Sequence, residues 1–98
     1  MSIDADAMLA ARPRIGDHVV HRAFVAETVV LNLDTGKYHG LNPIAGRMLE
    51  ALVRAETVDA AAHEVADHYG ESLDVVRRDL LELCADLAQR GLLQLDEA

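Results

Sequence analysis

The chain has 98 residues, which is enough for one small domain and leaves no room for a second hydrophobic core. Apolar residues make up 51% of the chain and charged residues 27%, which excludes the intrinsically disordered class. Seventeen acidic against nine basic side chains give a net charge of -8, so we expect no binding of nucleic acid.

The cellular compartment is indicated by Cys84, since a single cysteine excludes an internal disulfide and favours a reducing cytoplasm. No apolar run approaches the roughly 20 residues that a membrane-spanning helix needs. Asp4 and Asp6 stand where a signal peptide carries basic residues. The sequence therefore predicts a cytoplasmic protein that does not bind a membrane.

Residues 1–13 are expected to form a flexible N-terminal arm. They are only weakly hydrophobic, and Arg12-Pro13-Arg14 is typical of extended chain rather than helix. Residues 14–98 are expected to form a single domain.

The first half of that domain is predicted to be a small sheet, with strands at about 18–24, 28–33 and 37–41, where β-branched and aromatic residues are enriched. Asp34-Thr35-Gly36 indicates a hairpin between the second and third strands, because glycine accepts the positive φ of the turn. In a simple meander the third strand lies at an edge, which a protein either protects or uses.

Three helices are predicted to follow the strands. Asn42 is an N-cap before Pro43 at the first helical position, and this helix is expected to reach about residue 56, with Ile44 on its core stripe. Tyr69 is expected on the core stripe of the second helix. The fold class is therefore α+β, a winged helix-turn-helix with a three-stranded antiparallel sheet before three helices. The other helix limits are an N-cap and a closing glycine, Thr57 and Gly70 for the second helix and Ser72 and Gly91 for the third.

The third helix carries more apolar surface than its core stripe requires. A second strip advances at helical spacing beside the predicted core stripe. The core stripe comprises Leu73, Val76, Leu80, Leu83, Cys84 and Leu87. One interpretation is that the second strip packs on another helix, and the alternative is that it walls a groove. The side with the acids Asp79, Glu82 and Asp86 is expected to lie in water. The strip comprises Arg77, Leu81, Ala85 and Ala88, flanked by Asp74 and Arg78.

Gly40 lies inside the third strand, where a glycine marks a bulge, a bend into the next helix or the close approach of another backbone. An edge strand with this glycine and a helix with a second apolar strip are typical of a cleft for a peptide. The candidate peptide-binding residues are Lys37, Tyr38, His39, Gly40 and Leu41 on the strand and Asp74, Arg77, Arg78, Leu81 and Ala85 on the helix.

Catalytic and metal chemistry are not expected. The histidines form no convergent set, since the pairs His63–Asp67 and Glu64–His68 offer two ligands each and a bound zinc ion needs three or four. The thiol of Cys84 is assigned to the core, where such groups are inert. The sequence contains no nucleophile motif and no phosphate-binding glycine loop. We therefore expect a protein that is not an enzyme and holds no cofactor.

The run from Val29 to Pro43 resembles the PqqD family, and its most specific part is D-x-G-x-Y-x-x-L-N from Asp34 to Asn42. The ending with Leu87, Gly91, Leu92 and Leu93 is similar to that family too, and the likeness covers roughly residues 19–95. The resemblance implies a winged helix-turn-helix and a RiPP recognition element. Such a module binds the leader of a ribosomally made precursor peptide without catalysis and presents it to a leader protease or another modifying enzyme. It also implies that the leader is added as a strand to residues 37–41 and packs on the third helix.

Four functions remain open at this point. The pathway is lasso-peptide assembly or a similar one, and the alternative within the family is a chaperone of pyrroloquinoline quinone synthesis. A DNA-binding regulator is disfavoured because the third helix carries three arginines against four acids. A dimerisation module would pair the exposed strand with its own copy, and we expect a monomer or a weak homodimer.

Overall fold

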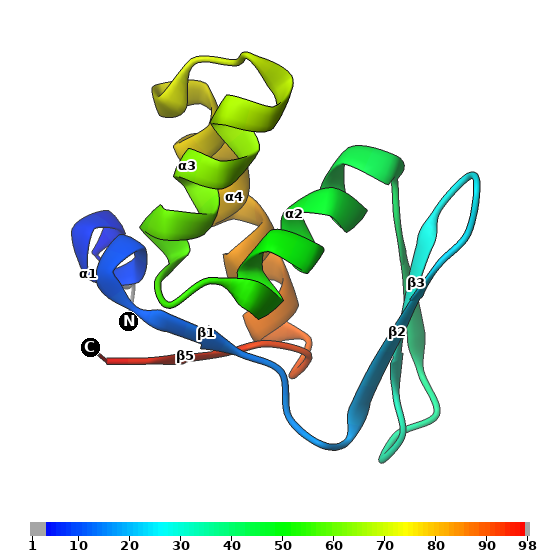
Figure 1. Ribbon diagram of the computed structural model, residues 1–98. Coiled ribbons are helices and arrows are strands. Elements are labelled where there is room, and N and C mark those ends of the chain that lie inside the picture. Colours follow the sequence, from blue (N-terminus) through cyan, green and yellow to red (C-terminus); the bar gives the residue numbers. More distant parts are fainter. Residues whose placement is uncertain (1–3, 98) are drawn as a thin grey trace.

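The computed structural model describes residues 4–97 of the chain. The three predicted strands are β2, β3 and β4, and the three predicted helices are α2, α3 and α4 (Figure 1). Helix α1 and strands β1 and β5 were not predicted. The elements in chain order are α1 (Ala5–Ala10), β1 (Arg12–Arg14), β2 (Val19–Ala23), β3 (Thr28–Asn32), β4 (Tyr38–Leu41), α2 (Pro43–Arg54), α3 (Val58–Tyr69), α4 (Leu73–Gln89) and β5 (Gln94–Asp96).

The α+β class and the three-stranded antiparallel sheet are confirmed. The strand order is β2-β3-β4, so β4 lies at an edge as the meander predicts. The hairpin before β4 turns at Gly36, whose φ of 74° is in the left-handed region that favours glycine. The side chain of Asn32 accepts hydrogen bonds from the backbone N–H groups of Asp34 and Thr35, which holds the turn.

The helix limits agree with the capping signals. The Asn42 side chain accepts a hydrogen bond from the N–H of Ala45 at 2.8 Å, and that of Thr57 accepts from Ala60 at 3.0 Å. Ser72 occupies the N-cap position of α4 but makes no side-chain capping bond. The local sequence therefore sets where α2 and α3 begin.

The core lies between the helices and one face of the sheet, and the other face carries no helix (Figure 1). Gly46 brings α2 close to β3, since a Cβ at this position would collide with the side chain of Thr28. Cys84 is buried in the stripe of α4 where the spacing placed it. The fully buried side chains are Leu49, Leu52, Leu80, Leu87, Val30, Val58 and Cys84.

The N-terminal segment differs from the flexible arm expected for residues 1–13. In its described part, residues 4–13, Met8 of α1 and Ala11 are buried in contact with the core. The N–H of Val58 donates to the carbonyl of Ala11 at 3.0 Å. Strand β1 pairs with β5 in a second, two-stranded antiparallel sheet. A six-residue helix has no stability of its own, so its formation depends on these tertiary contacts.

Candidate functional site

Strand β4 offers a free edge to an added strand. The N–H of Asn32 donates to the carbonyl of Lys37, and antiparallel pairs alternate between bonded and non-bonded. In the register of β3 and β4, the bonded pairs are then Val30 with His39 and Thr28 with Leu41. The backbone N–H and C=O groups of Tyr38 and Gly40 therefore project away from β3, along the free edge.

Gly40 does not form the bulge that its position in the strand indicated. It stands opposite Val29 in a continuous register. A Cβ at Gly40 would lie 3.0 Å from a carboxylate oxygen of Glu27 and meets no backbone within 4 Å. Close backbone approach to this glycine is therefore absent among the described residues, and the edge is open to another chain.

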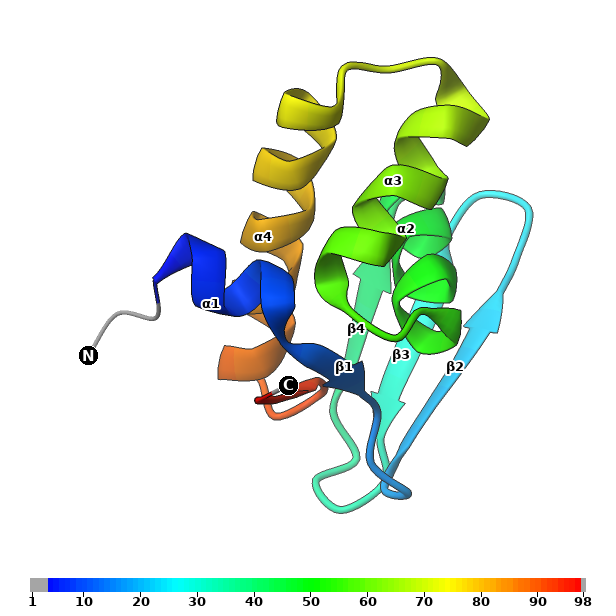
Figure 2. The same cartoon turned by 60° about the vertical axis from the view of Figure 1, so that its left-hand side comes forward.

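Helix α4 lies across from that edge, and His39 connects the two elements (Figure 2). Its Nε2 is 3.4 Å from Oδ2 of Asp86, whose other oxygen accepts a hydrogen bond from Nε of Arg90 at 3.0 Å. A hollow of about 340 Å³ opens between β4 and the C-terminal end of α4. It is lined by Asn32, Thr35, Lys37, Tyr38, His39, Gln89, Arg90 and Leu92.

A second hollow, of about 360 Å³, lies at the other end of α4, between α2, α3 and α4. Ile44 and Tyr69 line it and are 56% and 42% exposed, so their predicted place in the core is wrong. Their helical spacing matches the core stripes, but their side chains lie at the open rim of this hollow. The remaining lining consists of Met48, Val65, Val75 and Val76 with two carboxylates, Glu71 and Asp79.

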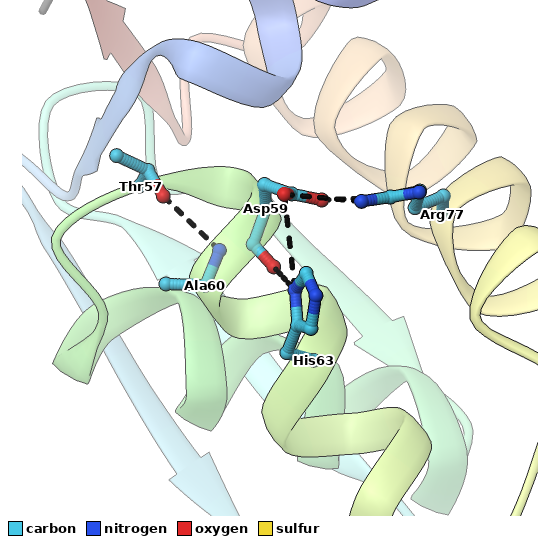
Figure 3. A network of polar contacts seen from close by, with 5 residues as sticks. All are labelled: Thr57, Asp59, Ala60, His63 and Arg77. Carbon is cyan, nitrogen blue, oxygen red and sulfur yellow. Dashed lines mark hydrogen bonds and ion pairs between the residues drawn. The ribbon is translucent and has the colours of Figure 1, made fainter.

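The predicted strip of α4 faces away from β4. Nε and Nη2 of Arg77 donate to the two carboxylate oxygens of Asp59 on α3, at 2.7 and 3.2 Å (Figure 3). The Arg77 hydrogen bond, against a smaller opposing effect of burial, lowers the pKa of Asp59, and the same contact raises the pKa of Arg77. Nδ1 of His63 lies 3.8 Å from the same carboxylate. Arg77 is thus engaged by α3, on the side of the molecule where α1 lies.

The structure therefore does not bring the two halves of the predicted site together. Lys37, Tyr38 and His39 line the hollow beside α4, whereas Leu41 is buried in the core. Leu81 is half-buried against the core on the flank of Arg77. Ala85, Asp74 and Arg78 are exposed. Of the two interpretations of the strip, packing on another helix is the one that the Arg77–Asp59 contact supports. The acids expected in water include Asp79 and Asp86, which instead belong to the flank facing β4 and α2.

Comparison with known proteins gives the family. The family model described as coenzyme PQQ synthesis protein D (PqqD) matches residues 27–93, a segment that contains both β4 and α4. The chain belongs to the PqqD family. No significant match was found among curated proteins.

Two solved structures share the PqqD-family fold. TbiB1 in complex with the TbiA(beta) leader peptide is 30% identical, covers 83% of this chain and 94% of its own, and superposes with a TM-score of 0.74. Lasso peptide synthetase B1 complexed with the leader peptide is 20% identical, covers 86% and 99%, and has a TM-score of 0.75. The second likeness supports the fold alone.

The remaining groups of this PqqD-family chain that could carry chemistry are its cysteine and its metal-ligating side chains. Burial raises the pKa of the Cys84 thiol to about 12, so the thiolate needed for nucleophilic chemistry does not form at neutral pH. Within residues 4–97, no cluster of three or more metal-ligating side chains occurs, and no helix is both long and apolar enough to cross a membrane.

The flank of α4 that faces β4 was not among the candidate site residues predicted from the sequence. Its residues are spaced four, four, three and four apart, which is the same kind of helical spacing as the predicted strip. The signal was present, but Asp79 and Asp86 were assigned to a solvated face and Leu83 to the core stripe, so the residues were not grouped as one flank. These residues are Val75, Asp79, Leu83, Asp86 and Arg90.

Proposed function

We propose that this chain is a leader-peptide recognition protein of RiPP biosynthesis, in lasso-peptide assembly or a similar pathway. The leader of a precursor peptide binds as an added strand along β4 and packs on the flank of α4 that contains Leu83. The chain itself carries out no chemistry and presents the leader to a protease or another modifying enzyme.

The free edge of β4 beside α4 is the observation that carries the proposal. The outward N–H and C=O groups of Tyr38 and Gly40 provide four backbone bonding groups, independent of leader sequence. Each net hydrogen bond contributes about 0.5–1.5 kcal/mol, and micromolar binding needs about 8 kcal/mol. Apolar side chains in the two hollows supply the remainder after the cost of ordering the peptide.

The 30% identity to TbiB1, which was solved with a leader peptide, supports leader binding. We choose the lasso pathway over pyrroloquinoline quinone synthesis because a protein of the same fold is a lasso peptide synthetase B1. The description of the family model favours the quinone pathway, and the role there would also be to bind a precursor peptide. The two assignments share the cleft and differ in the peptide that fills it.

Fluorescence polarisation with labelled peptides tests the function. The probes are the TbiA(beta) leader peptide and the leaders of candidate lasso and quinone precursors, with a scrambled leader as the control. We expect saturable binding of one class at micromolar concentration, and amide shifts in an NMR titration that cluster at Tyr38, Gly40 and Leu83. Flat titrations with every leader, together with a gel shift on duplex DNA, would instead support the regulator.

A further inference from the structure

We use "cleft" for the space along the flank of α4 that faces β4, with one hollow at each end of the helix. Its two ends differ in charge. At the N-terminal end of α4, Glu71 and Asp79 lie at the hollow lined by Ile44 and Val75, and no basic residue lines that hollow among the described residues. Nε of Arg78 is 3.5 Å from Oδ1 of Asp79, but both side chains are well exposed, so water screens the pair. This end is apolar inside and acidic at its rim.

The other end carries the opposite sign. Lys37 and Arg90 line the hollow beside the C-terminal end of α4, together with the neutral side chains of Thr35 and Gln89. No ion pair within residues 4–97 involves Lys37. The carboxylate of Asp86 lies nearby and is paired with Arg90 and His39. The excess charge here is positive, in a chain whose net charge is -8.

The spacing of these charges matches a short extended peptide. Asp79 and Arg90 are about 16 Å apart along the helix axis, at about 1.5 Å per residue. A strand rises about 3.3 Å per residue, so about five leader residues span this distance. Leu83 lies between the two charged ends, on the same flank.

We propose that the cleft selects its leader by the order of charges as well as by apolar side chains, an inference that rests on the proposed function. The bound segment carries Lys or Arg at the end that faces Glu71 and Asp79. It carries Asp or Glu about five residues away, facing Lys37 and Arg90, with an apolar side chain between them. A leader bound in the reverse direction would place like charges together, so the same pattern fixes the direction of the strand.

The order of charges can be tested without a known precursor. A library of displayed random linear peptides is selected for binding to the wild-type chain. The enriched peptides are expected to share a basic and an acidic residue about five positions apart. The consensus peptide, labelled for polarisation, is expected to bind about tenfold more weakly to the double variant Glu71→Lys, Asp79→Lys. A consensus peptide with its two charges exchanged is expected to bind that variant better than it binds the wild type. The double variant Asp17→Lys, Asp67→Lys changes the net charge equally at two exposed acids outside the cleft, and it is the control.

Three outcomes separate the inference from the function on which it rests. Charge order in the enriched peptides and its reversal in the double variant support the inference. Enriched peptides that bind the cleft, and lose affinity in Leu83→Glu, but show no charge bias overturn the inference and leave leader binding intact. If no peptide is enriched, or if Leu83→Glu binds all enriched peptides normally, both the proposed function and the inference are wrong.

Discussion

The two flanks of α4 have similar compositions and opposite environments. One flank carries Arg77 and Leu81 and is covered by the chain itself, through the Asp59 ion pair and the neighbouring α1. The other carries Leu83 and Asp86, faces the unpaired edge of β4 and has a hollow at each end. Each flank has a leucine, an acid and an arginine. What separates the first flank from the proposed binding flank is that other parts of the chain engage Arg77 and Leu81.

The largest expected effect concerns the stripe between the flanks. With its pKa raised from 9.0 to about 12, Cys84 should react with a thiol reagent at about pH 8 some thousandfold more slowly in the folded than in the unfolded chain. Labelling followed by mass spectrometry, with and without denaturant, measures the ratio. Rapid labelling of the folded chain would mean that this stripe, and therefore both flanks, are wrongly placed.

A pair of leucine substitutions compares the flanks directly. Leu83→Glu should weaken leader binding at least about thirtyfold, because its carboxylate would be desolvated against the bound peptide. Leu81→Glu should leave affinity within about threefold and lower the free energy of unfolding by about 2 kcal/mol, since it inserts a charge between α4 and the core. Polarisation and urea unfolding on both variants provide the two measurements.

The opposite result for the two leucine variants would contradict the proposed site. If Leu81→Glu loses binding while the fold is retained, and Leu83→Glu binds normally, the leader lies on the flank of Arg77. Because both leucines are half-buried, each titration is performed under conditions in which circular dichroism shows a folded variant.

The secondary structure of this chain was predictable wherever a local signal specifies it. Asn42-Pro43 and Thr57 cap their helices through bonds to residues three positions away, and Gly36 satisfies a turn within its own hairpin. Strand β1 has no such signal, and helix α1 has a weak one, a 3.4 Å hydrogen bond from the N–H of Asp6 to the side chain of Asp4. The pairing of Arg14 with Gln94 joins opposite ends of the chain, and the position of α1 depends on Met8 reaching a core formed by later residues.

The site was half predictable for a related reason. The spacing of Leu80, Cys84 and Leu87 fixes which side of α4 is buried, and Gly40 and Tyr38 were placed on a strand that does lie at an edge of the sheet. A buried stripe has two flanks, however, and helical periodicity does not say which of them faces β4. That choice depends on how α3 and the sheet are arranged around α4, which only the Arg77–Asp59 and His39–Asp86 contacts reveal.

Helix α1 neighbours the flank of α4 that contains Arg77 and Leu81, which we call the closed flank. A substitution in α1 tests whether that flank takes part in binding. Met8 is 8% exposed and contributes to the core, so Met8→Ala should lower the free energy of unfolding by about 2 kcal/mol. Leader affinity should stay within about twofold, because α1 lies on the side away from β4 (Figure 2). Val25→Ala, at a fully exposed position, is the control and should change stability by less than about 0.5 kcal/mol. A leader affinity that falls with Met8→Ala would place α1 in the binding surface.

The smallest expected effect is the pH dependence of the ion pair on the closed flank. The pKa of Asp59 is lowered in the folded state, chiefly by the Arg77 hydrogen bond, so its carboxylate stabilises the fold at neutral pH. This contribution is fully present above the unfolded pKa of about 4 and is lost as the pH falls through the lower folded value. The difference in melting temperature between wild type and Asp59→Asn should therefore be constant from about pH 7 to pH 5 and shrink below about pH 4.

Asp67→Asn provides the matched control, since Asp67 is an exposed acid on the same helix and its removal changes the net charge equally. Arg77→Met should reproduce the pH profile of Asp59→Asn, because both changes break the same contact. The measurement is thermal unfolding followed by circular dichroism across this pH range. A difference in melting temperature between wild type and Asp59→Asn that stays the same at every pH would show that the ion pair does not hold α3 against α4. The closed flank would then depend on Leu81 and the apolar contacts of α1 alone.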